Sequence, residues 1–165
     1  MLKFKDYGDI VLQFLPDLAP KTVENFKKLA TEKFYDGTKS HRLIPGFMIQ
    51  LGDPLTKDPT MESKWGQGDP GYKIKAEFSK EPHMKGIVSM ARSNDPDSAG
   101  SQFFICFATA PHLDGKYTVF AKVIQGIDVL DKLEKVPQIG SKPQKPVILE
   151  SVTLIPRSEL KTPAQ

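Results

Sequence analysis

The sequence predicts one domain built mainly from β-strands, arranged as a sandwich or a barrel. Apolar alternation recurs in many short segments bounded by turn residues, and only two segments place apolar residues at helical spacing. The chain has 165 residues, of which 39% are hydrophobic and 26% charged, as is ordinary for a globular protein. A chain of this length buries roughly two thirds of its unfolded surface.

The first predicted elements are a β-hairpin and a helix. Apolar residues alternate on either side of the Tyr7-Gly8 turn signal between residues 2 and 14, as they do in two paired strands. A helix is predicted from Pro20, because proline suits the first helical turn. Its apolar stripe consists of Val23, Phe26, Leu29 and Ala30.

The remaining elements are strands, one more helix and a long loop. Strands are predicted over 38–44, 47–51, 87–90, 103–106, 119–123 and 147–155, and a second helix over 127–133 with Ile127, Leu130 and Leu133 on one side. Residues 54–72 lack periodicity and predict a surface loop, in which Trp65 either pins the loop to the body or offers a platform for a ligand. The domain is expected to span 1–156, followed by a polar tail at 157–165 whose end frays.

Composition argues against nucleic acid and membrane partners. The formal charge of +3 comes from 23 basic and 20 acidic residues spread along the chain, which does not favour nucleic-acid binding. Lys3, Lys5 and Asp6 interrupt the start of the chain, so neither a signal peptide nor a membrane span is expected, and the sequence predicts a cytoplasmic protein.

Several kinds of chemistry are disfavoured by residue spacing. The three histidines lie far apart and lack ligand spacing with the single cysteine, Cys106, so no metal site is expected. Cys106 itself is interpreted as a small buried hydrophobe, with a reactive thiol as the alternative. The glycines at 66, 68 and 71 follow no predicted strand, and Pro70 interrupts them, so no nucleotide cofactor is expected. Ser101 lies outside any nucleophile-elbow pattern.

The segment 40–54, SHRLIPGFMIQLGDP, carries the main functional signal. Pro45-Gly46 marks a turn, after which Met48 and Gln50 alternate with apolar residues, so the strand shows different chemistry on its two faces. If Arg42 returns over Met48 and Gln50 from the preceding strand, the surface is apolar with one cation and one amide, which suits an uncharged peptide. Each residue also has an ordinary interpretation, as core filler or a solvated charge.

A second segment, 86–123, supplies Ala91, Gln102, Phe104 and Leu113. Together with the runs HRLIPGFMIQ and GSQFFI, and with GDIVLQF, APKTVENF and VILESVTL, the chain resembles the cyclophilins, the cyclosporin-binding family of peptidyl-prolyl isomerases. The resemblance implies a closed antiparallel barrel of eight strands capped at each end by an α-helix, with a filled interior and a ligand groove outside. It implies a monomer without cofactor or metal, whose partners are proline-containing peptides and unfolded proteins.

The resemblance also implies a role for each residue of the site. Arg42 would donate a hydrogen bond to the prolyl nitrogen as the amide twists, a role that suits a rigid guanidinium that stays charged. Gln50 would hold backbone polar atoms of the peptide, Ala91 and Arg92 would offer main-chain groups, and Gln102 would form the floor. The proline ring would lie among Phe47, Met48, Phe104 and Leu113.

Three residues depart from the best-known members of the resembled family. His112 replaces a tryptophan, Tyr117 replaces a histidine at the pocket edge, and Arg92 replaces an asparagine. These changes leave the isomerase expectation in place but predict weaker cyclosporin binding, because an imidazole offers less area than an indole. Two other functions stay open: a module that binds proline loops without turnover, and a small-molecule carrier, which would need a hollow barrel.

Overall fold

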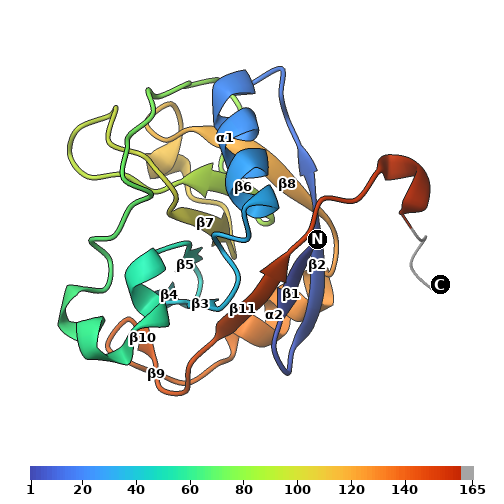
Figure 1. Ribbon diagram of the computed structural model, residues 1–165. Helices are drawn as coiled ribbons and strands as arrows, with labels where there is room; N and C mark the ends of the chain where they lie inside the picture. The colour runs from blue at the N-terminus through green and yellow to red at the C-terminus, as the bar shows by residue number, and fades with distance from the viewer. Residues whose placement is uncertain (161–165) are drawn as a thin grey trace.

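A curled antiparallel sheet of nine strands forms the body of the protein in the computed structural model, which describes residues 1–160 (Figure 1). The strands follow the order β3-β11-β1-β2-β8-β6-β7-β5-β4. Their bounds are β1 (Leu2–Phe4), β2 (Gly8–Phe14), β3 (Thr38–Lys39), β4 (Arg42–Ile44), β5 (Met48–Leu51), β6 (Ile87–Met90), β7 (Phe103–Cys106), β8 (Val119–Gln125) and β11 (Ile148–Val152). The mainly β fold class is therefore confirmed.

The sheet does not close into the expected eight-stranded barrel. β3 and β4 form its two ends, and no pairing joins them within residues 1–160, so the sheet is an open half-barrel. The single strand expected over 38–44 is broken, because the backbone donors on either side of the break have partners outside the sheet. Lys39 N–H donates to Thr56 Oγ1 at 2.8 Å, and Leu43 N–H donates to Ser141 O at 2.6 Å. Neighbouring segments thus cover the free edges, which protects them from further pairing.

One of these covering segments was not predicted. β9 (Gln138–Ile139) and β10 (Lys142–Pro143) form a short two-stranded ribbon beside β4. The tail expected at 157–165 begins with a 3₁₀ turn, η4 (Arg157–Glu159), and residues 161–165 of that tail lie outside the described residues.

One α-helix lies at each end of the curled sheet in Figure 1, as expected. α1 (Pro20–Thr31) begins at Pro20, and its predicted apolar stripe is buried. The Glu77 carboxylate accepts the N–H of Thr22 at 2.7 Å near the start of this helix, where the helix dipole favours a negative charge. α2 (Ile127–Glu134) lies where the second helix was predicted, and it buries Leu130 and Leu133, whereas Ile127 in its first turn is 39% exposed.

The segment 54–72 contains two 3₁₀ helices, where the sequence predicted only a loop. η1 (Pro54–Lys57) and η2 (Pro59–Lys64) each follow an aspartate whose carboxylate accepts a backbone N–H of the first turn. The two Asp-Pro pairs were thus unrecognised helix starts. Trp65 pins the segment, because Nε1 donates to Asp58 O at 3.2 Å and its ring lies beneath the Lys39 and Lys142 amines.

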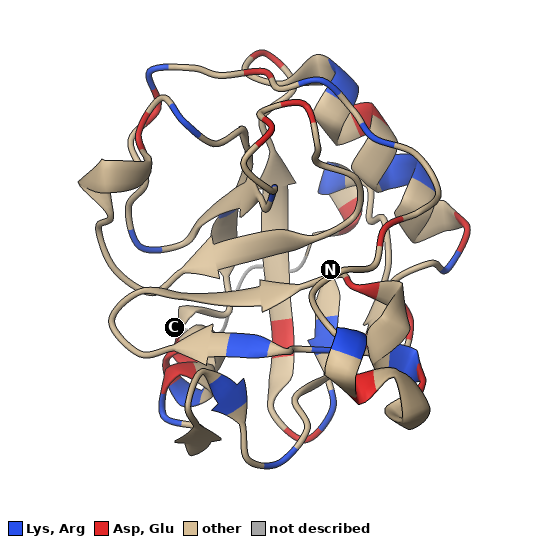
Figure 2. Ribbon diagram, turned by 90° about the vertical axis from the view of Figure 1, so that its left-hand side faces the viewer, with Lys and Arg blue, Asp and Glu red and all other residues tan. Residues whose placement is uncertain are grey.

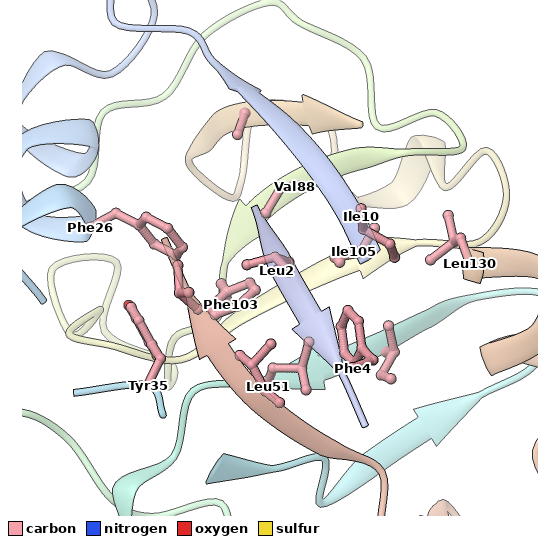
Figure 3. Packing of buried hydrophobic residues seen from close by; sticks show 14 of the residues in the cluster. Leu2, Phe4, Ile10, Phe26, Tyr35, Leu51, Val88, Phe103, Ile105 and Leu130 are labelled. Carbon is pink, nitrogen blue, oxygen red and sulfur yellow. The ribbon is translucent and has the colours of Figure 1, made fainter. Parts of the chain in front are cut away.

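Side chains fill the space enclosed by the curled sheet. Figure 3 shows Leu2, Ile10, Val88 and Phe103, which come from four strands, pointing into one cluster. Phe26 of α1 packs into the same cluster, with its ring centroid 5.3 Å from that of Phe103. A filled interior excludes the small-molecule carrier, which required a hollow one.

Charged residues of both signs are distributed over the helices and loops in the view of Figure 2, where the sheet is largely uncharged. Among residues 1–160, no helix combines the length and the apolar character needed to cross a bilayer.

Candidate active site

The strands β5 and β7 have two chemically different faces. Ile49 and Leu51 of β5 are fully buried in the main core, together with Phe103 and Ile105 of β7. The residues between them face the other way, into a separate apolar cluster formed by Met48, Phe104, Cys106, Ala110 and Leu113. One face of β5 therefore packs into the main core, and the opposite face carries Met48 and Gln50, as their alternation predicted.

The strand register places Arg42, Gln50 and Phe104 side by side on this outer face. Arg42 of β4 pairs with Gln50 of β5, and Gln50 pairs with Phe104 of β7. Residues that pair directly across antiparallel strands share a face of the sheet. The guanidinium, the amide and the aromatic ring therefore belong to one surface, although 62 positions of sequence separate the first from the last.

A hollow of about 200 Å³ lies on this surface, and it contains nine of the eleven residues predicted for the site. Its lining consists of His41, Arg42, Phe47, Met48, Gln50, Ala91, Arg92, Phe104, Leu113 and Tyr117. The other two predicted residues lie at its margins. Gln102 lines an adjoining hollow of about 350 Å³, and the exposed His112 lies beside Phe47, with the ring centroids 5.4 Å apart. Hereafter the two hollows are called the groove.

Arg42 is exposed, and its side chain makes no ion pair or hydrogen bond with the rest of the described chain. Its backbone is held in place, because the Ser40 hydroxyl donates to Arg42 O at 3.0 Å and β4 pairs with β5. The five guanidinium N–H groups are therefore open to a ligand on a fixed piece of backbone.

Two glutamines form a linked pair at the floor. Gln50 Nε2 donates to Gln102 Oε1 at 2.8 Å, and Gln102 Nε2 donates to the carbonyls of Gly66 at 3.1 Å and Gly68 at 2.8 Å. These bonds fix the orientation of both amides. Gln50 Oε1 has no hydrogen-bond partner among residues 1–160, so it can accept a backbone N–H from a ligand.

The apolar end of the groove is built from stacked rings. Phe104 is 5% exposed, and its ring meets Tyr117 edge-on with centroids 5.7 Å apart. Cys106 lies behind it, fully buried, and burial raises the pKa of its thiol to about 12. Cys106 is thus the small hydrophobe that the sequence predicted, and the reactive-thiol alternative is wrong.

No role was predicted for two histidines that belong to this region. His41 lines the groove, and burial lowers its pKa. His83 is fully buried behind Phe104, with the two rings stacked at 6.1 Å, and its ring nitrogens lie 3.1 Å from Asp114 Oδ1 and 3.1 Å from Ser89 Oγ. No local sequence signal identifies His83, because its partners are 31 and 6 positions away.

The spatial arrangement of Asp114, His83 and Ser89 resembles a hydrolytic triad, but these three residues cannot act as one. Nδ1 faces a carboxylate and therefore carries the proton, which leaves Nε2 to accept from the serine hydroxyl. Ser89 and His83 are both fully buried, so no substrate reaches the hydroxyl. The three side chains instead connect β6, and the loop before it, to the turn that carries Leu113.

Comparison with known proteins identifies the family of this chain. The family model described as cyclophilin type peptidyl-prolyl cis-trans isomerase/CLD matches residues 1–154, and the chain belongs to that family of enzymes, which interconvert the cis and trans forms of peptide bonds before proline. A probable peptidyl-prolyl cis-trans isomerase of Brucella abortus is 50% identical over 141 residues, covering 82% of this chain and 70% of the relative. Peptidyl-prolyl cis-trans isomerase-like 3 of Homo sapiens is 44% identical over 144 residues, covering 86% of this chain and 85% of the relative.

Solved structures give the same family. A cyclophilin-type isomerase of Cryptosporidium parvum, crystallised in the presence of the dipeptide Ala-Pro, superposes with a TM-score of 0.81 at 32% identity, covering 91% of this chain and 94% of that one. The cyclophilin AquaCyp293 of Hirschia baltica superposes with a TM-score of 0.77 at 26% identity, covering 97% of this chain and 74% of that one.

Proposed function

We propose that this isomerase works by hydrogen bonding from Arg42 to the prolyl nitrogen of a twisted X-Pro amide. Amide resonance sets a barrier of roughly 18–20 kcal/mol to rotation, and no covalent bond is broken. As the bond twists, the nitrogen recovers a lone pair that can accept a hydrogen bond. A donor aimed at this nitrogen binds the twisted state better than either planar state, which is what catalysis by differential binding requires.

The observation that carries this proposal is the guanidinium of Arg42, which has no partner among residues 1–160 and lines the same hollow as several apolar side chains. In the proposed complex the proline ring occupies the part of the groove lined by Phe47, Met48, Phe104 and Leu113. Gln50 Oε1 accepts a backbone N–H of the peptide, while its Nε2 stays bound to Gln102.

Replacement of Arg42 tests the mechanism. Arg42→Ala is expected to lower kcat/KM for a short X-Pro peptide by roughly 10² to 10³, the usual cost of losing one preorganised donor. The melting temperature should change little, because the side chain is exposed. Lys3→Ala, on a strand outside the groove, is the control and should keep full activity.

The Arg42→Ala experiment also separates catalysis from binding alone. If the folded variant binds the peptide and turns it over at the wild-type rate, Arg42 is not the donor. If neither protein accelerates the reaction although both bind the peptide, the chain is the non-catalytic binding module that the sequence left open.

We also propose that cyclosporin binds weakly. His112 lies beside Phe47 at the margin of the groove, where its imidazole offers less surface than the tryptophan expected in the family. His112→Trp should therefore raise cyclosporin affinity, measured by tryptophan fluorescence or calorimetry, and an unchanged affinity would exclude this explanation.

Other expectations from the sequence stay predictions. They are a monomer in solution, a cytoplasmic location, unfolded proteins as clients, and a domain of residues 1–156 followed by a polar tail. Gel filtration, cell fractionation, a refolding assay and a chain ending at residue 156 test them in turn.

A further inference from the structure

Arg92 lies at the junction of the two hollows of the groove. It follows β6 by two residues, and it lines both hollows together with Gln50 and Ala91. A peptide that extends from the proline pocket into the adjoining hollow must therefore pass this side chain.

The guanidinium of Arg92 is held in one place. Nε donates to Lys116 O at 2.9 Å, Nη1 donates to Ser93 O at 2.9 Å, and the group lies 4.6 Å from the centroid of the Tyr117 ring. A cation over an aromatic face is attracted by the ring quadrupole. Because these contacts already restrict the side chain, a ligand that binds it loses little further side-chain entropy.

The positive charge of Arg92 is not neutralised by these contacts. Its hydrogen-bond acceptors are backbone carbonyls, and no carboxylate lies within ion-pair distance of it among residues 1–160. Nη2 has no hydrogen-bond partner in the same part of the chain. One donor edge of a fixed cation is therefore available.

The acidic residues of the same loop are engaged elsewhere. Asp95 Oδ1 accepts the N–H of Asp97 at 2.9 Å, and Asp97 Oδ1 accepts the N–H of Ala76 at 2.9 Å. The adjoining hollow is lined by one acidic residue, Asp69, and by Lys73, whose positive charge balances it. That hollow therefore adds no net negative charge to the groove. The proline pocket itself contains a second guanidinium, that of Arg42, which like Arg92 has no carboxylate partner among residues 1–160, so the groove carries an excess of positive charge.

We propose that Arg92 makes this enzyme selective for X-Pro peptides that carry a carboxylate side chain within two residues of the proline. The inference rests on the proposed function, since it places the peptide in the same groove. Selection arises because a bound carboxylate meets a donor that is already fixed and positively charged, whereas a lysine at the same position meets two like charges.

The test compares matched peptides with the wild type and three variants. Each peptide contains one X-Pro bond and a single Glu, Gln or Lys at one of the two positions before or after the proline. At about 10 mM salt and pH 8, in the wild type, kcat/KM for the best Glu peptide should exceed that of its Gln counterpart by roughly three- to tenfold and that of its Lys counterpart by more. The excess should shrink at about 0.5 M salt.

Three variants test whether the charge of Arg92, rather than its packing, causes the preference for Glu peptides. In Arg92→Met, kcat/KM for the Glu peptide and for the Gln peptide should agree to within about twofold. Arg92→Lys should keep part of the preference for the Glu peptide because it keeps the charge. Lys3→Met removes the same charge from β1, outside the groove, and should keep the wild-type ratio. Melting curves establish that each variant is folded, and Arg92→Lys serves if Arg92→Met does not fold.

Two results would overturn the inference: equal Glu and Gln rates in the wild type, or a Glu preference that survives in Arg92→Met. If Arg92→Met fails to fold, a Glu to Gln ratio in Arg92→Lys equal to that of the wild type at both salt concentrations also counts against a role for the guanidinium fork. Failure of the proposed function is distinguishable, because it would appear with Gln peptides as well: either Arg42→Ala would keep the wild-type rate, or the wild type would accelerate none of the peptides.

Discussion

Acidification should destabilise this protein through His83 well before its carboxylates titrate. The ring is fully buried, and burial lowers its pKa in the folded state, although hydrogen bonding and the charge of Asp114 act in the opposite direction. The unfolded chain therefore binds a proton more readily than the folded one. The stability that depends on neutral His83 is complete above the unfolded pKa of about 6.5, and it is lost as the pH falls below that value towards the folded pKa.

The size of the effect follows from the protonation of the unfolded state. If the ring stays neutral in the fold, lowering the pH from about 7.5 to about 5.5 costs at most about 1.4 kcal/mol through this one histidine. For a domain of this size the loss lowers the melting temperature by several degrees. Asp114 titrates at lower pH, since the backbone N–H of His83 lowers its pKa from the ordinary value, so the two groups act in separate pH ranges.

His41 must be controlled for, because burial lowers its pKa as well and the sign of its effect is the same. Urea unfolding at pH 7.5 and 5.5 should therefore be measured for the wild type, His83→Asn, His41→Asn and the double variant. We expect His83→Asn to be less stable at pH 7.5, because buried hydrogen bonds cost about 1–3 kcal/mol when a partner is left unpaired, and to lose less stability on acidification. An identical pH dependence in the wild type and His83→Asn would refute the reasoning.

Three further predictions follow from single contacts. Gly46 N–H donates to Glu134 Oε2 at 2.7 Å, so Glu134→Ala should shift the Gly46 amide resonance in NMR spectra and lower the free energy of unfolding by about 1 kcal/mol. Glu134→Gln keeps an acceptor oxygen, so most of the hydrogen bond and of the stability should remain. The Cys106 thiol, with a pKa of about 12, should resist alkylation at pH 8 in the native protein and react once denaturant unfolds it. Phe104→Ala should weaken peptide binding and reduce the free energy of unfolding by about 3–5 kcal/mol, measured by titration and urea melts, in contrast to Arg42→Ala.

Much of this fold is encoded in local spacing. Alternation around the Tyr7-Gly8 turn predicted β1 and β2, and the stripe after Pro20 predicted α1, because burial on one face imposes a period of 2 or 3.6 residues on the sequence. The same period predicted that Met48 and Gln50 share a face of β5. The residues that make this chain resemble the cyclophilins predicted most of the residues that line the groove.

Phe47 marks the limit of such local reasoning. Alternation alone groups it with Ile49 and Leu51 on the buried face, but Phe47 lies in the turn before β5 begins, and its ring lines the groove. A period of 2 holds only where the backbone is extended.

The tertiary structure decided the features that depend on partners distant in sequence. The sheet is open because Leu43 binds Ser141 instead of a strand at the other end, and the buried role of His83 depends on Asp114. The fixed charge of Arg92 likewise depends on backbone carbonyls such as that of Lys116. Periodicity records which face of an element is buried, but it carries no information about which distant atom satisfies a given donor, and that pairing is determined only when the whole chain is packed.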